Sequence, residues 1–464
     1  MTKCALQRGR FRSSALAVLA AWVVVAARAS AGQGEEISIP SRPLNVRDCI
    51  SLALNESPAL EASRLEVASA TEEARAARGE ALPSITASAS YQLFNGSPTS
   101  KFSVVDIGTG VGVTSGKEVD LGAVELYSAH LSYPLFRDGN IFGLNTGPAE
   151  AAKLAKKRNL AWTAKLRREE VIARVAEAYI TTVSAENRAG YTTRRVDLLE
   201  KEVGIVQEQV KQGLMLPLDL KLSQSQLSGA RTLSVILRQQ AVSGKIQLAR
   251  SLGFDSPDAL HLSNELPELP EPPSAEQLLG PLLAQHPSLQ VQKALIDEAK
   301  ENYRLERFRL YPSVTLSGSA VHIDDFSPEG SEVYLGAINV NVPVFDFGTQ
   351  MSNTRAKLAK YQAERARLGA VADDVTSDVV KLFQSIYVLS QNILSLEYDV
   401  GKADREFQVI SAQQAQGISP PLTLIERELQ LISRKDELQG LKVRRLDLYA
   451  ALQKVSGGLW KWIE

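Results

Sequence analysis

The chain of 464 residues is poor in cysteine, histidine and catalytic motifs. Of its two cysteines, Cys4 lies in an N-terminal segment predicted to be removed, which leaves Cys49 alone and excludes an internal disulfide. The sequence contains no Walker motif, no Gly-x-Ser-x-Gly and no Cys-x-x-Cys. The four histidines lie too far apart in sequence for a metal-ligand pattern: His130, His261, His286 and His322. These absences argue against an enzyme, a metal site and a bound cofactor.

Long apolar runs are also absent beyond the N-terminus. The run at 15–27 spans 13 residues, fewer than the roughly 20 that cross a bilayer. It follows four basic residues and is followed by two Ala-x-Ala sites, which predicts a secretory signal peptide over residues 1–29 rather than a membrane anchor. An exported chain without a membrane helix is either soluble or crosses the membrane with β-strands.

Neither sign of charge dominates the chain. It has 52 basic and 53 acidic residues, a formal net charge of −1. Cleavage after Ala29 would remove five basic residues and no acidic one, which leaves a net charge of about −6. A mildly acidic mature chain without a basic stripe argues against nucleic acid as a partner and against cationic binding to a membrane surface.

The sequence does contain one long unit written twice. Pro58 and Pro83 of the first copy match Pro287 and Pro312 of the second, both at an offset of 229 residues. Later landmarks match at other offsets: 209 for Pro-Leu-Phe at 134–136 and Pro-Val-Phe at 343–345, and 204 for Gly213 with Gly417 and Gly253 with Gly457. The first copy therefore has 20 extra residues before its Pro-Leu-Phe, which we assign to a loop around 95–119.

This repetition defines the predicted domains. They are an N-terminal extension (30–45), repeat 1 (46–253), a proline-rich extended connector (254–274), repeat 2 (275–457) and a C-terminal tail (458–464).

Each repeat begins with a helical pattern, over about 46–81 and 275–310, that a proline ends. The pattern then changes to period two, in strands of about 10 residues, which is enough for a tilted membrane strand. In 84–93 the apolar residues take odd positions, whereas in 313–320 they take even positions. Because the offsets 229 and 209 are odd, equivalent apolar faces must change parity between the copies, and they do.

Aromatic residues gather near the predicted strand ends: Tyr91, Phe94, Phe102, Tyr133, Phe136, Phe326, Tyr334, Phe345 and Phe347. Aromatic side chains in such places are typical of a membrane–water interface. We single out four as membrane-interface residues: Tyr133, Phe136, Tyr334 and Phe345. A soluble β-sandwich would alternate in the same way, but the aromatic residues favour membrane strands.

Proline-free stretches follow each pair of strands, at about 149–212 and 349–416. Roughly 64 to 68 helical residues would extend about 100 Å. Apolar residues spaced three and four apart, such as Val196, Leu199 and Val203, predict coiled-coil packing. A turn containing glycine and proline ends each stretch, and return helices are predicted at about 218–252 and 422–456.

One chain would thus supply four membrane strands, which cannot close a barrel, and open sheet edges are not tolerated in lipid. We therefore expect several copies to join through their strands, with the hydroxyl-rich faces lining a water-filled lumen. The predicted fold class is an α+β membrane protein, in which a long α-helical coiled-coil barrel is continued by a transmembrane β-barrel.

The order and duplication of these motifs resemble the TolC-like outer-membrane efflux protein family, from about residue 44 to 457. The resemblance implies a homotrimer in the outer membrane that extends into the periplasm, with four strands from each copy. It also implies two partners, a periplasmic adaptor protein and an inner-membrane pump. The implied function is the exit channel of a tripartite efflux or type I secretion system, through which substrates leave passively.

The turns between the long and return helices would be the periplasmic tips. Six tip residues are candidates for contact with the adaptor: Gly213, Leu214, Pro217, Gly417, Ile418 and Pro420. Helix capping also explains these glycines and prolines, and both roles can hold.

The resemblance further implies acidic residues that narrow the periplasmic entrance, six and nine positions after the second tip glycine. Here these positions hold Thr423 and Glu426, so only one is acidic. Asp219, six positions after Gly213, is a further candidate for the pore constriction. A ring of Glu426 would favour cations, whereas a solvated helix face accounts for the same residue.

A periplasmic coiled-coil adaptor or scaffold is the alternative function. An adaptor of that kind has one long helical hairpin between strand-rich halves. The two predicted hairpins and the small amount of other β structure favour the channel.

Overall fold

The computed structural model describes residues 42–93, 103–105, 112–114, 123–254, 260–263, 275–324 and 331–458. The predicted signal peptide at 1–29 lies outside these residues, as do most of the N-terminal extension and the tail after Gly458. The architecture below is that of the unit Pro43–Glu464.

Each repeat opens with two helices where the sequence pattern predicted one. They are α2 (Val46–Glu56) and α3 (Pro58–Gly79) in repeat 1, and α6 (Ala275–Gln285) and α7 (Pro287–Phe308) in repeat 2. The breaks fall at Ser57 and His286, whose ψ angles of 116° and 129° are extended. Each of these residues precedes a proline, and the proline ring disfavours a helical conformation in the residue before it.

The strands of the two repeats join in one antiparallel sheet with the order β1-β4-β6-β7. These strands are β1 (Ser84–Leu93), β4 (Ala123–Arg137), β6 (Ser313–Asp324) and β7 (Ser331–Asn341). A short strand, β5 (Asn140–Ile141), turns back onto β4. In the region predicted to hold the extra residues of repeat 1, β2 (Ser103–Val105) and β3 (Gly112–Thr114) pair with each other.

The long helices match the lengths that the sequence predicted. α4 (Pro148–Lys211) has 64 residues and α8 (Thr349–Ala415) has 67. The return helices are α5 (Pro217–Ser251) and α9 (Pro421–Val455). Among the residues that the structure describes, none of the helices is both long and apolar enough to cross a membrane.

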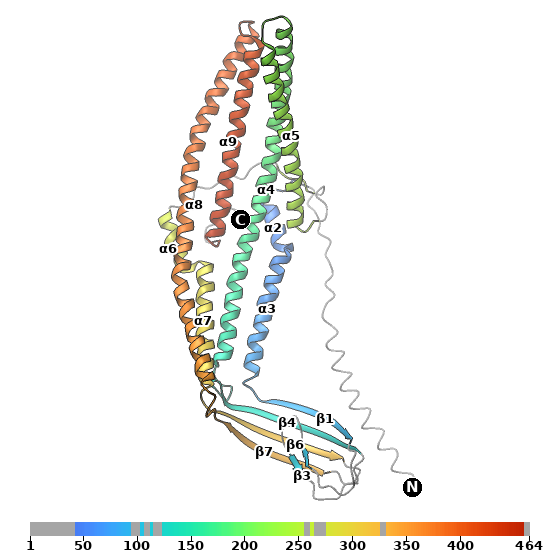
Figure 1. Cartoon of the computed structure of the whole chain (residues 1–464), viewed down its shortest axis with the longest axis vertical. Coiled ribbons are helices and arrows are strands. Elements are labelled where there is room, and N and C mark those ends of the chain that lie inside the picture. Colours follow the sequence, from blue (N-terminus) through green and yellow to red (C-terminus); the bar gives the residue numbers. More distant parts are fainter. Residues whose placement is uncertain are drawn as a thin grey trace, which may run out of the picture. The chain divides into compact units, whose positions relative to one another are not determined.

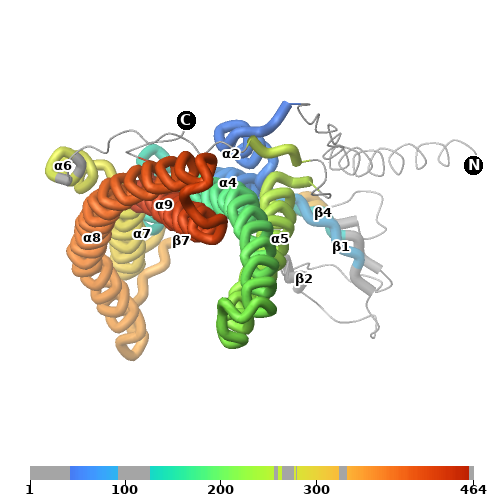
Figure 2. The backbone as a smooth tube through the Cα atoms, turned by 90° about the horizontal axis from the view of Figure 1, so that it is seen from above, coloured from blue at the N-terminus to red at the C-terminus, as the bar shows by residue number. Residues whose placement is uncertain are grey.

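The shorter helices flank the long ones in pairs (Figure 1). α4 contacts α3 on the side of the sheet and α5 on the side of the tips, and α8 contacts α7 and α9 in the same way. α4 also contacts α7 and α9, so α4 joins the two repeats. Viewed from above, α8, α9, α4 and α5 follow one another in a curved row (Figure 2).

The helix interfaces have the heptad spacing of a coiled coil. On α5 the buried positions include Leu227, Ala230 and Leu237, and the first two pack with Leu199 of α4. On α8 the buried positions follow the same spacing: Val379, Ile386, Leu389, Ile393 and Leu396. The coiled-coil packing predicted from the spacing of apolar residues is therefore present in both hairpins.

Part of the connector between the repeats is extended and packs beside the start of α2. Leu44 and Leu262 form a parallel β-bridge, and the Tyr179 hydroxyl of α4 donates to the Ser263 carbonyl at 2.9 Å. Cys49 of α2 is fully buried. Burial raises the pKa of Cys49 to about 12, so its thiol is protonated at neutral pH.

Candidate functional site

The sheet has one apolar face and one hydroxyl-rich face. The register places Ile85 opposite Leu131, and Ala320 opposite Tyr334, all on the apolar face. That face is exposed in the single chain: Ile85 is 76% and Tyr334 is 74% exposed. Monomeric soluble proteins rarely expose contiguous apolar patches of this kind. We therefore do not expect this face to remain in contact with water in the functional protein.

The opposite face carries hydrogen-bonded hydroxyl groups. The Oγ atoms of Ser88 and Ser128 lie 2.7 Å apart, and His130 Nδ1 lies 3.2 Å from Ser319 Oγ. Ser128 and Ser319 are only 7% and 8% exposed. On the central strands β4 and β6 this face is therefore more enclosed than the apolar face, and it also holds the buried Leu126 and Val321.

The outer strands of this sheet are β1 and β7. Within the part of the chain that the structure describes, each pairs on one side only, β1 with β4 and β7 with β6. The side chains of β7 from Tyr334 to Asn341 are all exposed. The sheet thus presents two strand edges with free backbone hydrogen-bonding groups.

The two helical tips share one capping geometry. Gly213 and Gly417 have φ angles of +75° and +73°, a left-handed conformation that glycine adopts without strain. The residue after each glycine closes the turn. The Leu214 N–H donates to the Gln209 carbonyl at 2.8 Å, and the Ile418 N–H donates to the Gln413 carbonyl at 2.9 Å. Leu214 and Ile418 are 72% and 68% exposed. Each cap therefore displays an apolar side chain at the end of its hairpin.

The two candidate prolines at the tips lie at the starts of the return helices. Pro217 is the first residue of α5, and Pro420 is the N-cap residue of α9. Proline suits these positions because no backbone N–H is needed there. Capping thus accounts for the prolines, while exposure makes the tips available for contact.

α4 and α9 form the seam between the two repeats near the tips. Arg188 donates to both carboxylate oxygens of Asp436, at 2.8 and 3.2 Å. Six residues farther along α4, Arg194 forms an ion pair with Glu428 of α9. Apolar side chains fill the space beside these pairs: Leu198, Ile425 and Ile432, with Tyr191, Ile205 and Leu429 packed against them.

A second acidic residue, which no sequence pattern singles out, lies near Glu426 in the structure. Glu426 is exposed on α9, and Glu202 of α4 lies close enough to feel its charge. Burial raises the pKa of Glu202, the charge of Glu426 raises it further, and a hydrogen bond from Ser223 of α5 opposes both. Helical spacing could not reveal this pair, because the two residues are separated by more than 200 positions and meet only through the α4–α9 seam.

The other two candidates for the constriction begin helices. The Leu216 N–H donates to the Asp219 carboxylate at 3.0 Å, and the Asp219 N–H returns a bond to the Leu216 carbonyl. Asp219 thus caps the start of α5, where a negative charge also suits the helix dipole. Thr423 lies at the equivalent place in α9, where its N–H donates to the Pro420 carbonyl at 3.2 Å.

Two carboxylates also meet at the other end of the α4–α9 seam. Asp447 of α9 is half-buried, and one of its oxygens is enclosed without a hydrogen-bond partner among the described residues. Burial, reinforced by the charge of Glu177 on α4, raises the pKa of Asp447 to about 6. Along the seam, two pairs of like charge therefore flank the ion pairs Arg188–Asp436 and Arg194–Glu428.

The predicted interface aromatics differ in exposure. Tyr334 and Phe345 are 74% and 77% exposed, and the ring of Phe345 lies 4.6 Å from that of Phe347. Tyr133 and Phe136 are half-buried, and the Tyr133 hydroxyl donates to the Phe142 carbonyl at 2.8 Å. Phe345 follows β7 and Phe136 lies near the end of β4, so both mark the junction of sheet and helices.

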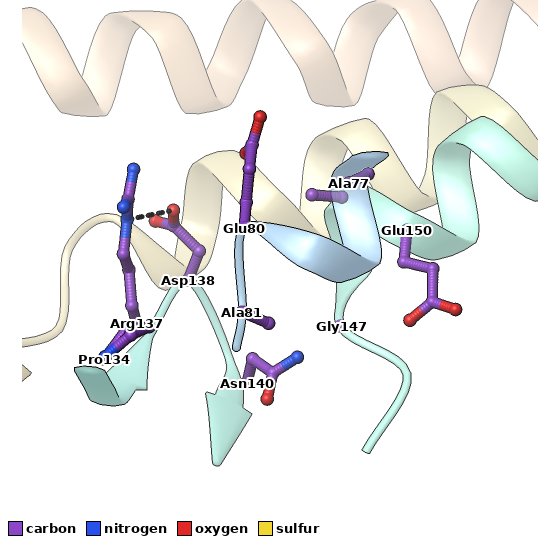
Figure 3. Close-up of a pocket in the computed structure, with 10 residues that line it drawn as sticks. Ala77, Glu80, Ala81, Pro134, Arg137, Asp138, Asn140, Gly147 and Glu150 are labelled. Carbon is purple, nitrogen blue, oxygen red and sulfur yellow. Dashed lines mark ion pairs between the residues drawn. The ribbon is translucent and has the colours of Figure 1, made fainter. Parts of the chain in front are cut away.

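A pocket lies at this junction in repeat 1 (Figure 3). The neighbouring residues Arg137 and Asp138 form an ion pair of 3.5 Å at the turn after β4, and Glu80 and Ala81, which follow α3, line the same pocket. Asn140 also lines the pocket: its amide nitrogen donates to the Asn145 carbonyl at 3.0 Å, whereas its amide oxygen is buried without a partner among the described residues. Among the described residues, no group of three potential metal ligands comes together.

Solved structures share this arrangement of a two-hairpin sheet continued by two long helical hairpins. The CmeC outer membrane channel of Campylobacter jejuni matches with a TM-score of 0.73 at 13% identity, over 93% of this chain and 92% of that one. The outer membrane protein VceC of Vibrio cholerae matches with a TM-score of 0.71 at 17% identity, over 89% of this chain and 96% of that one. The fold is that of the TolC-like outer-membrane channels.

The sequence identifies the family within that class. Residues 49–254 and 278–458 match the outer membrane efflux protein family, and the chain belongs to this family. It is 23% identical over 299 residues to the pyoverdine export outer membrane protein OpmQ of Pseudomonas aeruginosa, and 22% identical over 310 residues to a probable efflux pump outer membrane protein, TtgC, of Pseudomonas putida. Each match covers 62% of this chain and 61% of the relative, so the chain matches about three fifths of these relatives' length.

Membership assigns the chain to a class of outer membrane transport proteins rather than to an enzyme family. It confirms the resemblance to the outer-membrane efflux protein family that the order of the sequence motifs predicted. The residue-level roles at the tips, at the constriction and at the membrane interface stay predictions.

Proposed function

We propose that the chain is one of three subunits of an outer-membrane exit channel for a tripartite efflux or type I secretion system, and that it catalyses no reaction. The proposal rests on the sheet. Among the described residues it has two unpaired edges, an exposed apolar face and a hydroxyl-rich opposite face. In lipid such edges must be paired. Identical copies joined β1 to β7 would pair them and turn the apolar face to the lipid and the hydroxyl groups to a water-filled lumen.

Complementary charge on the helices supports the same assembly. The two helices at the ends of the curved row are α5 and α8 (Figure 2). α5 carries five basic residues and one acidic residue, whereas the part of α8 from 373 to 415 carries seven acidic and three basic residues. Both helices also expose apolar side chains, such as Leu222 and Val235 on α5 and Tyr387 and Tyr398 on α8. α5 of one copy would then pack against α8 of the next.

The tips support the proposed partners. Leu214 and Ile418 are exposed apolar side chains on rigid, glycine-capped turns, which is a suitable contact for a periplasmic adaptor that connects the channel to an inner-membrane pump. OpmQ is named for pyoverdine export and TtgC for an efflux pump. We propose by this likeness that small molecules are the cargo.

The proposed gate is the acidic pair near the tips. Three copies of Glu426, each beside Glu202, would concentrate negative potential at the periplasmic entrance and favour cations. Asp219 and Thr423 would contribute less, because both are held at helix starts.

Deleting the gene and measuring drug susceptibility and dye accumulation tests the transport function. We expect the deletion strain to accumulate substrate, and the full-length gene to restore export. The double variant Leu214→Asp with Ile418→Asp, expressed from the restored gene, should reach the outer membrane but fail to restore export. Full export by that variant would contradict the adaptor contact, and normal export without the gene would contradict the channel.

A further inference from the structure

The apolar face of the sheet contains a depression that crosses all four long strands. Its floor is a row of three alanines, because the register places Ala87 of β1 opposite Ala129 of β4, and Ala129 opposite Ala320 of β6. Tyr334 of β7 ends this row opposite Ala320. The depression has a volume of about 410 Å³, which is within the range of small-molecule sites.

The two neighbouring rows differ in the size of their side chains. Toward the β6–β7 turn, the next row holds Tyr127, His322 and Glu332, which line the depression as a wall. On the other side of the floor lie Gly318 and Gly336, and a Cβ atom on Gly336 would meet nothing within 4 Å. The depression is therefore a groove that is closed toward the turn and open toward the middle of the sheet.

The wall of the groove carries an available hydrogen-bond acceptor. The Tyr334 hydroxyl donates to Glu332 Oε2 at 2.9 Å. Glu332 Oε1 lies 4.0 Å from His322 Nδ1, which is beyond hydrogen-bond distance. The side chain of Glu332 is 60% exposed, so Oε1 can accept a donor from outside the chain.

Strand length places this polar wall at one boundary of the apolar band. β6 and β7 have 12 and 11 residues, so at a tilt of about 45° they rise about 25–28 Å, close to the height of the apolar band of an outer-membrane barrel. Glu332 is the second residue of β7, whereas the helix α8 begins beyond the opposite end of that strand. Glu332 thus lies at the external boundary, and the alanine floor lies just inside the apolar band.

We propose that this groove binds one acyl chain of an outer-membrane lipid, whose polar head donates a hydrogen bond to Glu332 Oε1. The chain would pack on the alanine methyl groups beside Tyr127 and Tyr334 and continue over Gly318 and Gly336. An ammonium head fits best, because it donates hydrogen bonds and its charge is opposite to that of Glu332.

A lipid is the occupant that the proposed assembly leaves in place. Copies joined edge to edge, β1 to β7, leave the faces of their sheets uncovered, and members of this family are outer membrane proteins. The inference rests on the proposed function, in which the apolar face is turned to the lipid.

Photo-crosslinking of the full chain in lipid nanodiscs tests the groove. The bilayer would contain a trace of phosphatidylethanolamine with a diazirine on one acyl chain, and labelled residues would be mapped by mass spectrometry. We expect more label at Tyr127 and Tyr334 than at Ile338, which is exposed on the same face outside the groove. Ala129→Phe fills the floor and should lower the label at both tyrosines, whereas Ile338→Phe, which adds the same ring outside the groove, should not.

A second probe tests the role of Glu332. Phosphatidylcholine with the same diazirine has a quaternary ammonium, which cannot donate a hydrogen bond. We expect it to label the groove about threefold to tenfold less than phosphatidylethanolamine, the range of polar interactions within membranes. Glu332→Val removes the acceptor and should abolish this difference.

The results that contradict the proposal can be told apart. Label spread evenly over the apolar face and unchanged in Ala129→Phe would refute the groove, but it would leave the lipid-facing sheet intact. Equal label from the two probes in the wild type would refute the contact with Glu332. Absence of label from the whole apolar face would overturn the proposed membrane sheet as well.

Discussion

Single charged residues determine the properties of the α4–α9 seam. Arg188 and Asp436 meet in a bidentate pair, whereas Glu202 with Glu426, and Glu177 with Asp447, are pairs of like charge. Exposed ion pairs contribute little to stability, but two carboxylates held together respond to pH and to cations. We therefore expect pH and cations to affect how the two repeats pack along this seam.

Glu426 is the acidic residue proposed to line the periplasmic entrance. Glu426→Lys should shift the channel in planar bilayers from cation preference toward anions, because the field at the entrance changes sign. Glu437→Lys, on the same helix and exposed, should leave the reversal potential near that of the wild type. Unchanged selectivity in Glu426→Lys would exclude this residue from the constriction.

Burial raises the pKa of Asp447 in the folded chain above its ordinary value. Its contribution to stability is fully present below pH 3.8 and is lost as the pH rises through about 6. Asp447→Asn should therefore be more stable than the wild type at pH 8, by about 1–2 kcal/mol after allowance for solvent screening. The advantage should shrink toward pH 4 in thermal denaturation; an equal or opposite difference at the two pH values would contradict the assignment.

At the scale of elements, the sequence was most informative where a pattern repeats. Period-two alternation predicted β1 with its observed bounds, and the proline-free stretches predicted α4 and α8. The breaks at Ser57 and His286 were missed because helix-forming residues lie on both sides of each proline. Glu202 was missed because its partner Glu426 becomes a neighbour only when α9 packs on α4.

Glycine substitutions test the turns of these elements. Gly213→Ala should cost about 1 kcal/mol, since φ is +75° but the space beyond Cα is open. Gly457→Ala should cost about 2–4 kcal/mol, because strain is joined by overlap with Pro287. Gly79→Ala, within α3, serves as the control and should be neutral or slightly stabilising. A lower apparent melting temperature for Gly213→Ala than for Gly457→Ala would contradict the close packing of Gly457 against Pro287.

In the whole molecule, the opposite charges of α5 and α8 are expected to stabilise the contact between neighbouring copies. Lys221→Glu with Arg238→Glu reverses two exposed charges on α5 and should lower the temperature at which oligomers dissociate. The loss should be larger at low salt than at high salt, because the attraction is screened. Lys201→Glu on α4 is the control. A loss that does not depend on salt would indicate that charge between copies is not the cause.

We propose that copies of this chain close one channel through the free edges of their sheets. Native mass spectrometry of the protein extracted from outer membranes tests this assembly. We expect a particle of three times the mass of the heat-denatured chain, which dissociates only on heating. Recovery of the protein as a single chain from the soluble periplasmic fraction would contradict it.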